Sequence, residues 1–134
     1  MAATANAIAL RLVVAVAASV PVAGGLWGAV EGLDGAAPWS ASHHRYLSGL
    51  LLAIGLGFWS TFAQIERHTH RFRLLTALVF LGGLCRLAGI LAGDPLTPPV
   101  AGALAMELIA APLLCLWQAQ VSASTPASQD PRLA

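Results

Sequence analysis

Charged residues are scarce in this sequence, and lysine is missing altogether. Only 10% of the 134 residues are charged, against about 25% in an average soluble domain. The seven basic residues are all arginines and the formal net charge is +1, which leaves no polybasic surface for nucleic acid. A chain that is 57% hydrophobic would expose large apolar patches in water, so a lipid bilayer is the more suitable solvent.

Cysteines are equally few, and the motifs of common enzyme chemistry are missing. Cys85 and Cys115 fall inside apolar runs at different depths, farther apart than the ~7 Å that a disulfide tolerates, so we interpret both as packing residues. There is no Gly-x-Ser-x-Gly elbow, no phosphate-binding loop and no Cys/His set for zinc. The histidines lie at opposite ends of the apolar runs, which argues against a haem held by two histidines. Nothing in the sequence therefore supports an enzyme, and we predict neither a cofactor nor a metal.

What is present is a set of four long apolar segments. Each has about 20 residues, the length that an α-helix needs to cross ~30 Å of hydrocarbon. The backbone must satisfy its own hydrogen bonds there, and none of the segments alternates like a barrel strand, so we predict helices. The fold class is all-α: an integral membrane protein built as an up-down antiparallel bundle of four transmembrane helices. The predicted helices cover about residues 7–30, 44–64, 72–93 and 98–118.

Turn and cap residues separate these segments. Gly93-Asp94-Pro95 predicts a tight turn at the end of the third helix. Ser42 is placed to cap the second helix, and Thr97 is placed to cap the fourth. Proline inside a helix removes a backbone donor, so we expect kinks at Pro21 and Pro112.

The arginines predict the orientation in the membrane. Three of them lie in the short loop 65–73, whereas the loop 31–44 and the turn 93–97 carry acidic residues and no arginine. The positive-inside rule then places loop 65–73 and both termini in the cytoplasm. A cleaved signal peptide over residues 1–25 is the alternative, and the lack of a basic residue before Arg11 argues against it.

The residues after the fourth helix differ in composition. The stretch 121–134 reads VSASTPASQDPRLA, which is rich in small polar residues and contains two prolines. Such a composition is typical of a disordered segment. The predicted organisation is a four-helix transmembrane domain over residues 1–120 and a disordered cytoplasmic tail over 121–134.

Two charged residues interrupt the apolar helices. Arg86 lies about 9 Å deep on the third helix and Glu107 about 14 Å deep on the fourth, counted from the same side at ~1.5 Å per residue. An unpaired charge at the bilayer centre costs at least ~2.5–3.5 kcal/mol, so these opposite charges should form an intramembrane salt bridge facing the bundle interior. Small residues on the same faces should let the helices approach closely. They are Gly82, Gly89, Ala103 and Ala110.

Further polar residues gather near the predicted outer ends of the helices. Together with the charged pair they predict an outward-opening polar pocket. Its residues are Glu31, His44, Arg45, Tyr46, Arg86 and Glu107. Two arginines against one deep carboxylate leave an unmatched positive charge, which suits an anionic group such as a carboxylate, a phosphate or a lipid headgroup. The simpler alternative is that Arg86 and Glu107 only clamp two helices, while Arg45 extends to lipid phosphate.

Several short elements of the sequence are characteristic in combination. They are RYLSGLLL, IERHTHRFR, GGLCRLAG and MEL, with a looser match at VPVAGGLWG. Over about residues 7–120 the chain resembles small bacterial membrane proteins catalogued as domain of unknown function 4345, some of which carry the label phage infection protein. One departure is FAQIE, where a proline-containing segment such as IPRIE is expected. The resemblance implies a four-helix protein of the bacterial inner membrane, and it carries over no activity, ligand or catalytic residue.

Three kinds of function are compatible with the sequence. The first is a non-enzymatic membrane protein whose pocket binds an anionic or lipid-like small molecule. The second is an accessory or scaffold subunit of a larger membrane complex, joined through the small-residue faces of the first two helices. These faces contain Gly24, Gly25, Gly28, Gly55 and Gly57. The third is a small transporter or membrane enzyme, although no internal repeat is detected. The expected partners are membrane lipid, another membrane protein or a second copy of the chain, and not nucleic acid.

Overall fold

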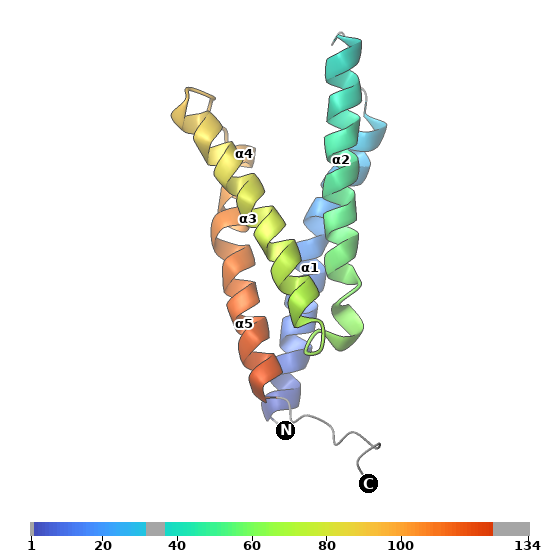
Figure 1. Ribbon diagram of the computed structural model, residues 1–134, viewed down its shortest axis with the longest axis vertical. Coiled ribbons are helices and arrows are strands. Elements are labelled where there is room, and N and C mark those ends of the chain that lie inside the picture. Colours follow the sequence, from blue (N-terminus) through green and yellow to red (C-terminus); the bar gives the residue numbers. More distant parts are fainter. Residues whose placement is uncertain (1, 32–36, 125–134) are drawn as a thin grey trace. The chain divides into compact units, whose positions relative to one another are not determined.

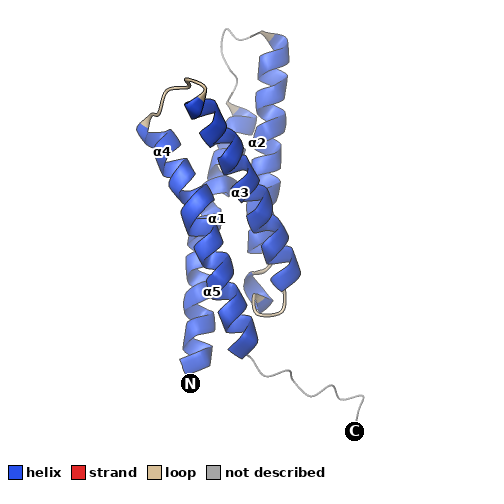
Figure 2. Cartoon of the chain, turned by 60° about the vertical axis from the view of Figure 1, so that its left-hand side comes forward, coloured by secondary structure: helices blue, strands red, loops and turns tan. Residues whose placement is uncertain are grey.

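The apolar segments form helices in the computed structural model, which describes residues 2–31 and 37–124. Helix α1 spans Ala2–Val30, α2 spans Pro38–Trp59 and α3 spans Thr69–Leu91, with a 3-10 turn, η1, at Phe62–Gln64. The last helix has three consecutive parts: α4 (Pro98–Ala105), a π-helical turn η2 (Met106–Ala110) and α5 (Ala111–Ser124). The described part of the chain contains helices and loops and no strand (Figure 2).

Four of these helical stretches are long and apolar enough to cross a membrane. They are Ala5–Val30, Pro38–Gln64, Thr69–Leu91 and Pro98–Ser124. Large apolar side chains such as Val16, Trp27 and Leu91 are exposed on them, as contact with lipid requires. The prediction of an all-α protein with four spans is confirmed, and the chain is a multi-pass membrane protein.

Contacts divide the chain into two units. The N-terminal unit is Arg11–Ala63, which contains most of α1 and all of α2. The C-terminal unit is Gln64–Ala134 together with Met1–Leu10, and its core is α3 against the last helix. Figure 1 shows α3 running beside α4 and α5 in the C-terminal unit.

Small residues hold α1 and α2 together in the N-terminal unit. The buried stripe of α1 repeats every three or four residues, which is one face of a helix. It consists of Val14, Ala18, Val22, Gly25 and Gly28. A β-carbon on Gly25 would lie 2.5 Å from the backbone nitrogen of Leu52, and one on Gly55 would lie 2.9 Å from that of Val22. The two backbones therefore approach as closely as membrane helices do at glycine interfaces.

Helix α2 begins at Pro38 rather than at residue 44, so the predicted cap at Ser42 is wrong. Proline suits the first helical position because its φ is already helical and because the N–H that it lacks would have no partner there. The N-cap is Ala37, which has no capping side chain. The helix ends at Trp59, and η1 covers the end of the predicted range.

The turn after α3 agrees with the sequence. Gly93 has a φ of +115°, a conformation that L side chains rarely adopt. Its N–H donates to the carbonyl of Ile90, and the N–H of Asp94 donates to the carbonyl of Gly89. These two bonds form the Schellman motif that closes a helix on glycine. Thr97 occupies the N-cap position of α4 as predicted, although its side chain makes no capping hydrogen bond.

A polar network joins the start of α3 to α5. The Gln118 side chain is fully buried, and its amide nitrogen donates to the carbonyl of Ile65 at 2.8 Å and to Thr69 Oγ1 at 3.0 Å. Ser122 Oγ donates to the carbonyl of Glu66 at 2.8 Å. Both carbonyls belong to the turn before α3 and lie outside its helical ladder. Side chains of α5 therefore supply the donors that the turn needs.

This network accounts for two differences from the predicted boundaries. Helix α3 begins at Thr69 rather than at residue 72, and the last helix continues to Ser124 rather than ending at 118. The prediction of a disordered segment is therefore wrong for residues 121–124, where Val121 is buried. The rest of the predicted tail lies outside the described residues.

Candidate functional site

Arg86 and Glu107 meet between α3 and η2 in the C-terminal unit. Arg86 Nε donates to Glu107 Oε2 at 3.0 Å, and Arg86 Nη2 donates to Oε1 at 3.1 Å. Two parallel N–H···O bonds are the fork geometry that a guanidinium and a carboxylate share, and they orient the arginine as well as neutralising it. The two charges that interrupt the apolar helices are thus brought together.

The ion pair is not buried. The Arg86 side chain is 42% exposed and the Glu107 side chain is 19% exposed. The prediction of a salt bridge enclosed in a bundle interior is therefore not borne out, because two helices in contact cover only one side of each side chain. Glu107 is the better covered partner, and Arg86 presents an open edge.

Gly83 brings the two helices close at this point. A β-carbon on Gly83 would lie 2.8 Å from Glu107 Cβ and 2.7 Å from Leu108 Cδ2. Gly83 precedes Arg86 by three residues, so both lie on the face of α3 that meets the last helix.

The glycines predicted for this close approach have other surroundings. Gly82 would meet no atom within 4 Å, so its predicted role is wrong, and Gly89 is covered by the Asp94 side chain. Helical spacings of three and four residues fit Gly83 and Gly82 equally well, and only the approach of the second helix distinguishes them. Ala103 and Ala110, predicted for the same role on the last helix, are partly buried.

Glu107 lies in the π-helical turn η2. The N–H of Ala111 bonds to the carbonyl of Met106, five residues back. Pro112 follows directly, and proline has no N–H and collides with the carbonyl four residues before it. The distortion expected at Pro112 is therefore located in the turn that precedes it. Such π turns occur frequently at functional sites, and this one sets the register in which Glu107 faces Arg86.

The other residues of the predicted pocket belong to the N-terminal unit. Glu31, Arg45 and Tyr46 are exposed, and His44 is partly buried. The structure brings together the ion pair within one unit. A pocket that joins the pair to these four residues stays a prediction.

The chemistry available at the ion pair is that of a positioned hydrogen-bond donor. A guanidinium has five N–H donors, and Glu107 accepts two of those of Arg86. The remaining donors are not used by Glu107, and the Arg86 side chain as a whole is 42% exposed. Across residues 2–31 and 37–124 no cluster of His, Cys, Asp and Glu could hold a metal ion, and both cysteines there are free.

Comparison with known proteins identifies the family of the chain. A family model described as Domain of unknown function (DUF4345) matches residues 9–118. The match includes Gly83, Arg86, Glu107 and Pro112, and it ends at Gln118. Neither a curated protein nor a solved structure matches the chain. Since the match covers most of its length, the chain belongs to the DUF4345 family.

Proposed function

We propose that the protein is a non-enzymatic component of the bacterial inner membrane that binds an anionic or lipid-like small molecule through Arg86. The observation that supports this most is the partial exposure of the Arg86–Glu107 ion pair. Glu107 holds the guanidinium at two points, while 42% of the Arg86 side chain stays exposed. An arginine used only as a clamp has no need of an open edge in a membrane-spanning helix.

Fixing the guanidinium favours ligand binding. A free arginine side chain loses rotamer freedom when it binds, and an arginine already held by a carboxylate has lost much of it beforehand. Hydrogen bonds to a charged donor are also stronger where lipid lowers the local dielectric constant. A ligand oxygen at the exposed edge would therefore gain a strong bond at a reduced entropic cost.

The net charge of the site calls for a second cation. Arg86 and Glu107 neutralise each other, so an anionic ligand also needs a positive group that no carboxylate offsets. Arg45 lies near the start of α2, at the end that also carries His44 and Tyr46. The sequence predicts that these residues and Glu31 supply that cation in an outward-opening pocket, and Arg45→Gln tests this prediction.

The proposed orientation follows from the arginines. The turn between the second and third spans carries Arg67, and Arg71 and Arg73 follow in the first turns of α3. By the positive-inside rule this end of the helices, and with it both termini, lies in the cytoplasm. The ion pair then opens on the outer half of the membrane.

The proposal is tested by what the protein carries through a gentle purification. Molecules extracted from the protein in mild detergent would be identified by mass spectrometry for the wild type and for Arg86→Gln. Cys85→Ser serves as the control, because it changes an exposed neighbour of Arg86 on α3 and removes no charge. We expect an anionic molecule that is lost in Arg86→Gln and kept in Cys85→Ser.

Two results would contradict the proposal. If the same molecules accompany Arg86→Gln and the wild type, Arg86 binds no ligand and the clamp is the better interpretation. If Arg45→Gln leaves the co-purifying molecule unchanged while Arg86→Gln removes it, the shared pocket is wrong and binding belongs to the C-terminal unit alone. Circular dichroism of each variant would establish that its helices are retained.

A further inference from the structure

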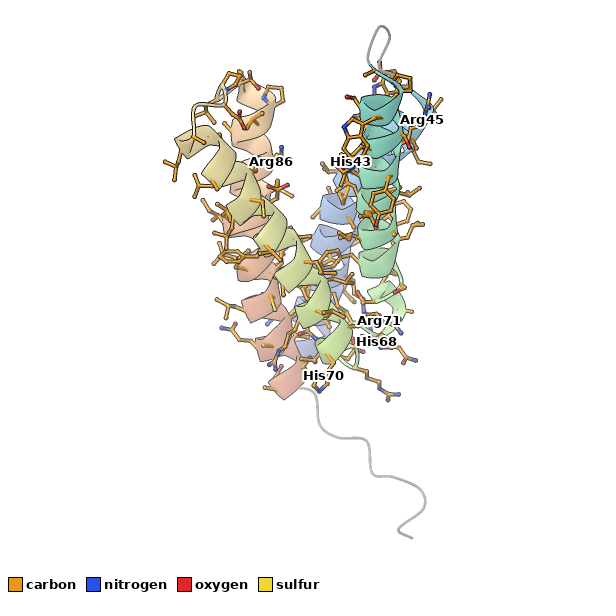
Figure 3. The ribbon with its side chains drawn as sticks, turned by 45° about the horizontal axis from the view of Figure 1, so that its top comes forward. His43, Arg45, His68, His70, Arg71 and Arg86 are labelled. Atoms are coloured by element: carbon orange, nitrogen blue, oxygen red, sulfur yellow. The ribbon has the colours of Figure 1, made fainter. Side chains whose placement is uncertain are left out.

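A second cationic region lies at the other end of α3 from Arg86. We call residues 67–73 the basic turn; it contains three arginines and two histidines. Arg67, His70, Arg71 and Arg73 are exposed, and His68 is partly buried. Figure 3 shows His68, His70 and Arg71 gathered at this end of α3, well away from Arg86. The basic turn is therefore separate from the ion pair.

The arginines of the basic turn are placed where a helix disfavours them. The first turn of α3 contains no acidic residue, and His68 at the N-cap makes no capping hydrogen bond. The start of a helix carries a partial positive charge, which repels cations. Glu66 is the one acidic residue next to the three arginines in sequence. The first turn of α3 supplies no acidic side chain to this positive helix end, so an external anion close to it would be favourable.

The backbone of the basic turn is held in place by α5. Gln118 and Ser122 donate to the carbonyls of Ile65 and Glu66, and Thr69 Oγ1 lies 3.1 Å from Ser122 Oγ. The cations are therefore presented from a fixed backbone, which lowers the entropic cost of binding compared with a flexible loop.

The spans on either side of the basic turn determine its position relative to the membrane, and therefore which ligands can reach it. Four residues separate the end of the second span at Gln64 from the start of the third at Thr69. A connection this short cannot extend far from the membrane, so its side chains lie at the level of the lipid headgroups. The anion most available at that level is a lipid phosphate.

We propose that the basic turn binds the phosphate group of anionic phospholipids. Arg67 and Arg73 donate to phosphate oxygens in the fork geometry that guanidinium groups favour, and Arg71 and His70 add positive charge nearby. This site is independent of the ligand proposed for Arg86, and its ligand is a lipid of the adjacent leaflet rather than free phosphate in solution.

The test compares lipids by native mass spectrometry of the full-length protein in mild detergent. The probes are phosphatidylglycerol and phosphatidylcholine with identical acyl chains, and glycerol 3-phosphate as the headgroup alone. We expect the wild type to prefer phosphatidylglycerol. Each of Arg67→Gln and Arg73→Gln should weaken its binding about fivefold, which corresponds to ~1 kcal/mol per basic residue, and the double variant about 30-fold. Arg67→Lys with Arg73→Lys keeps the charge but loses the fork geometry, so its affinity should lie between those of the wild type and the double glutamine variant.

Three outcomes would overturn the proposal. The first is equal affinity of the wild type for the two lipids. The second is that glycerol 3-phosphate binds as tightly as phosphatidylglycerol, which would make the site one for free phosphate. The third is that His43→Gln, at an exposed position of α2 used as the control, loses as much affinity as Arg67→Gln. Since the substituted side chains are exposed, circular dichroism should show unchanged helix content in all variants.

Discussion

The two units of this protein hold their helices together by different means. In the N-terminal unit the contact between α1 and α2 includes close backbone approach at Gly25 and Gly55. Trp59 Nε1 also donates a hydrogen bond to the carbonyl of Ala15 at 3.1 Å. In the C-terminal unit the contact includes an ion pair and the network around Gln118. Lipid tails are as apolar as the helices, so association needs close packing or polar contacts, and each unit uses one of them more heavily.

The different helix contacts of the two units bear on where we propose that ligands bind. Glycine contacts hold helices together and leave nothing that can recognise a ligand. Polar contacts also hold helices together, and they leave charged and hydrogen-bonding groups on apolar helices, where such groups are costly to keep. Both sites proposed for ligands therefore centre on the C-terminal unit, in Arg86 and in the basic turn.

The largest effect is expected from a side chain at the glycine contact. In Gly25→Val the new β-carbon would lie 2.5 Å from the backbone nitrogen of Leu52, and a backbone cannot move aside as a side chain can. We expect the free energy of unfolding to fall by about 3 kcal/mol, measured by titration with sodium dodecyl sulfate. Gly49→Val is the matched control, because nothing lies within 4 Å of Gly49. Equal losses in the two variants would show that packing does not distinguish these positions.

The next largest effect is expected from breaking the ion pair. Glu107→Leu leaves Arg86 without its carboxylate in an apolar span, which should lower the free energy of unfolding by about 2.5 kcal/mol. Adding Arg86→Met removes the uncompensated charge, so the double variant should return to within about 1 kcal/mol of the wild type. The same titration measures both. A double variant as unstable as Glu107→Leu alone would mean that the carboxylate has another structural partner.

A smaller loss is expected from the buried amide. Gln118→Leu deprives the carbonyl of Ile65 of a buried donor, at a cost of about 2 kcal/mol. Part of this cost is offset, because the substitution also removes Gln118 Oε1, a buried oxygen that has no hydrogen-bond partner among the described residues. Hydrogen exchange should also become faster in the turn before α3. Gln120→Leu, an exposed position, should change neither quantity. Slow exchange retained in Gln118→Leu would show that other contacts hold the turn.

The smallest effect tests a pair of adjacent glycines. In Gly83→Ala the new β-carbon would lie 2.7 Å from Leu108 Cδ2 and 2.8 Å from Glu107 Cβ, both of which are side-chain atoms rather than backbone. We expect a loss of about 1 kcal/mol in the unfolding titration. Gly82→Ala meets nothing and should be stabilising by up to about 1 kcal/mol, because alanine favours the helix more than glycine does. If both variants change stability in the same direction, Gly83 is not a contact point.

The N-terminal glycines also bear on the scaffold hypothesis. The faces considered for a protein partner include Gly25, Gly28 and Gly55, and each of these is buried against the other helix of its own unit. Packing within the unit explains these three glycines. Gly24 is exposed, and the scaffold hypothesis stays a prediction.

The predictions that succeeded depend on length and on local chemistry. Four apolar runs of membrane-spanning length indicated four helices. The turn at Gly93 was predictable because a positive φ favours glycine. Arg86 and Glu107 were predictable as partners because depth along a helix follows from residue count.

The predictions that failed depend on how two elements meet. Pro38 and Ser42 both fit local rules for helix starts, and only the structure shows that α2 begins at Pro38. Gly82 and Gly83 both share a face with Arg86, and only the structure shows which of them the last helix approaches. Gln118 carries no distinctive sequence signal, because a glutamine near the end of an apolar helix is ordinary. Its spacing of four residues from Ser122 was the one signal that these polar groups face the same side.

The sequence alone determined that the chain is helical, that four of its helices are long and apolar enough to cross a membrane, and that two opposite charges lie at similar positions along two of them. These properties follow from apolar length and residue count. Only the tertiary structure decided which glycine touches the facing helix, that a π turn before Pro112 points Glu107 at Arg86, and that Arg86 keeps an open edge. These properties depend on the separation and rotation of two helices, and many residues far apart in the chain set those jointly.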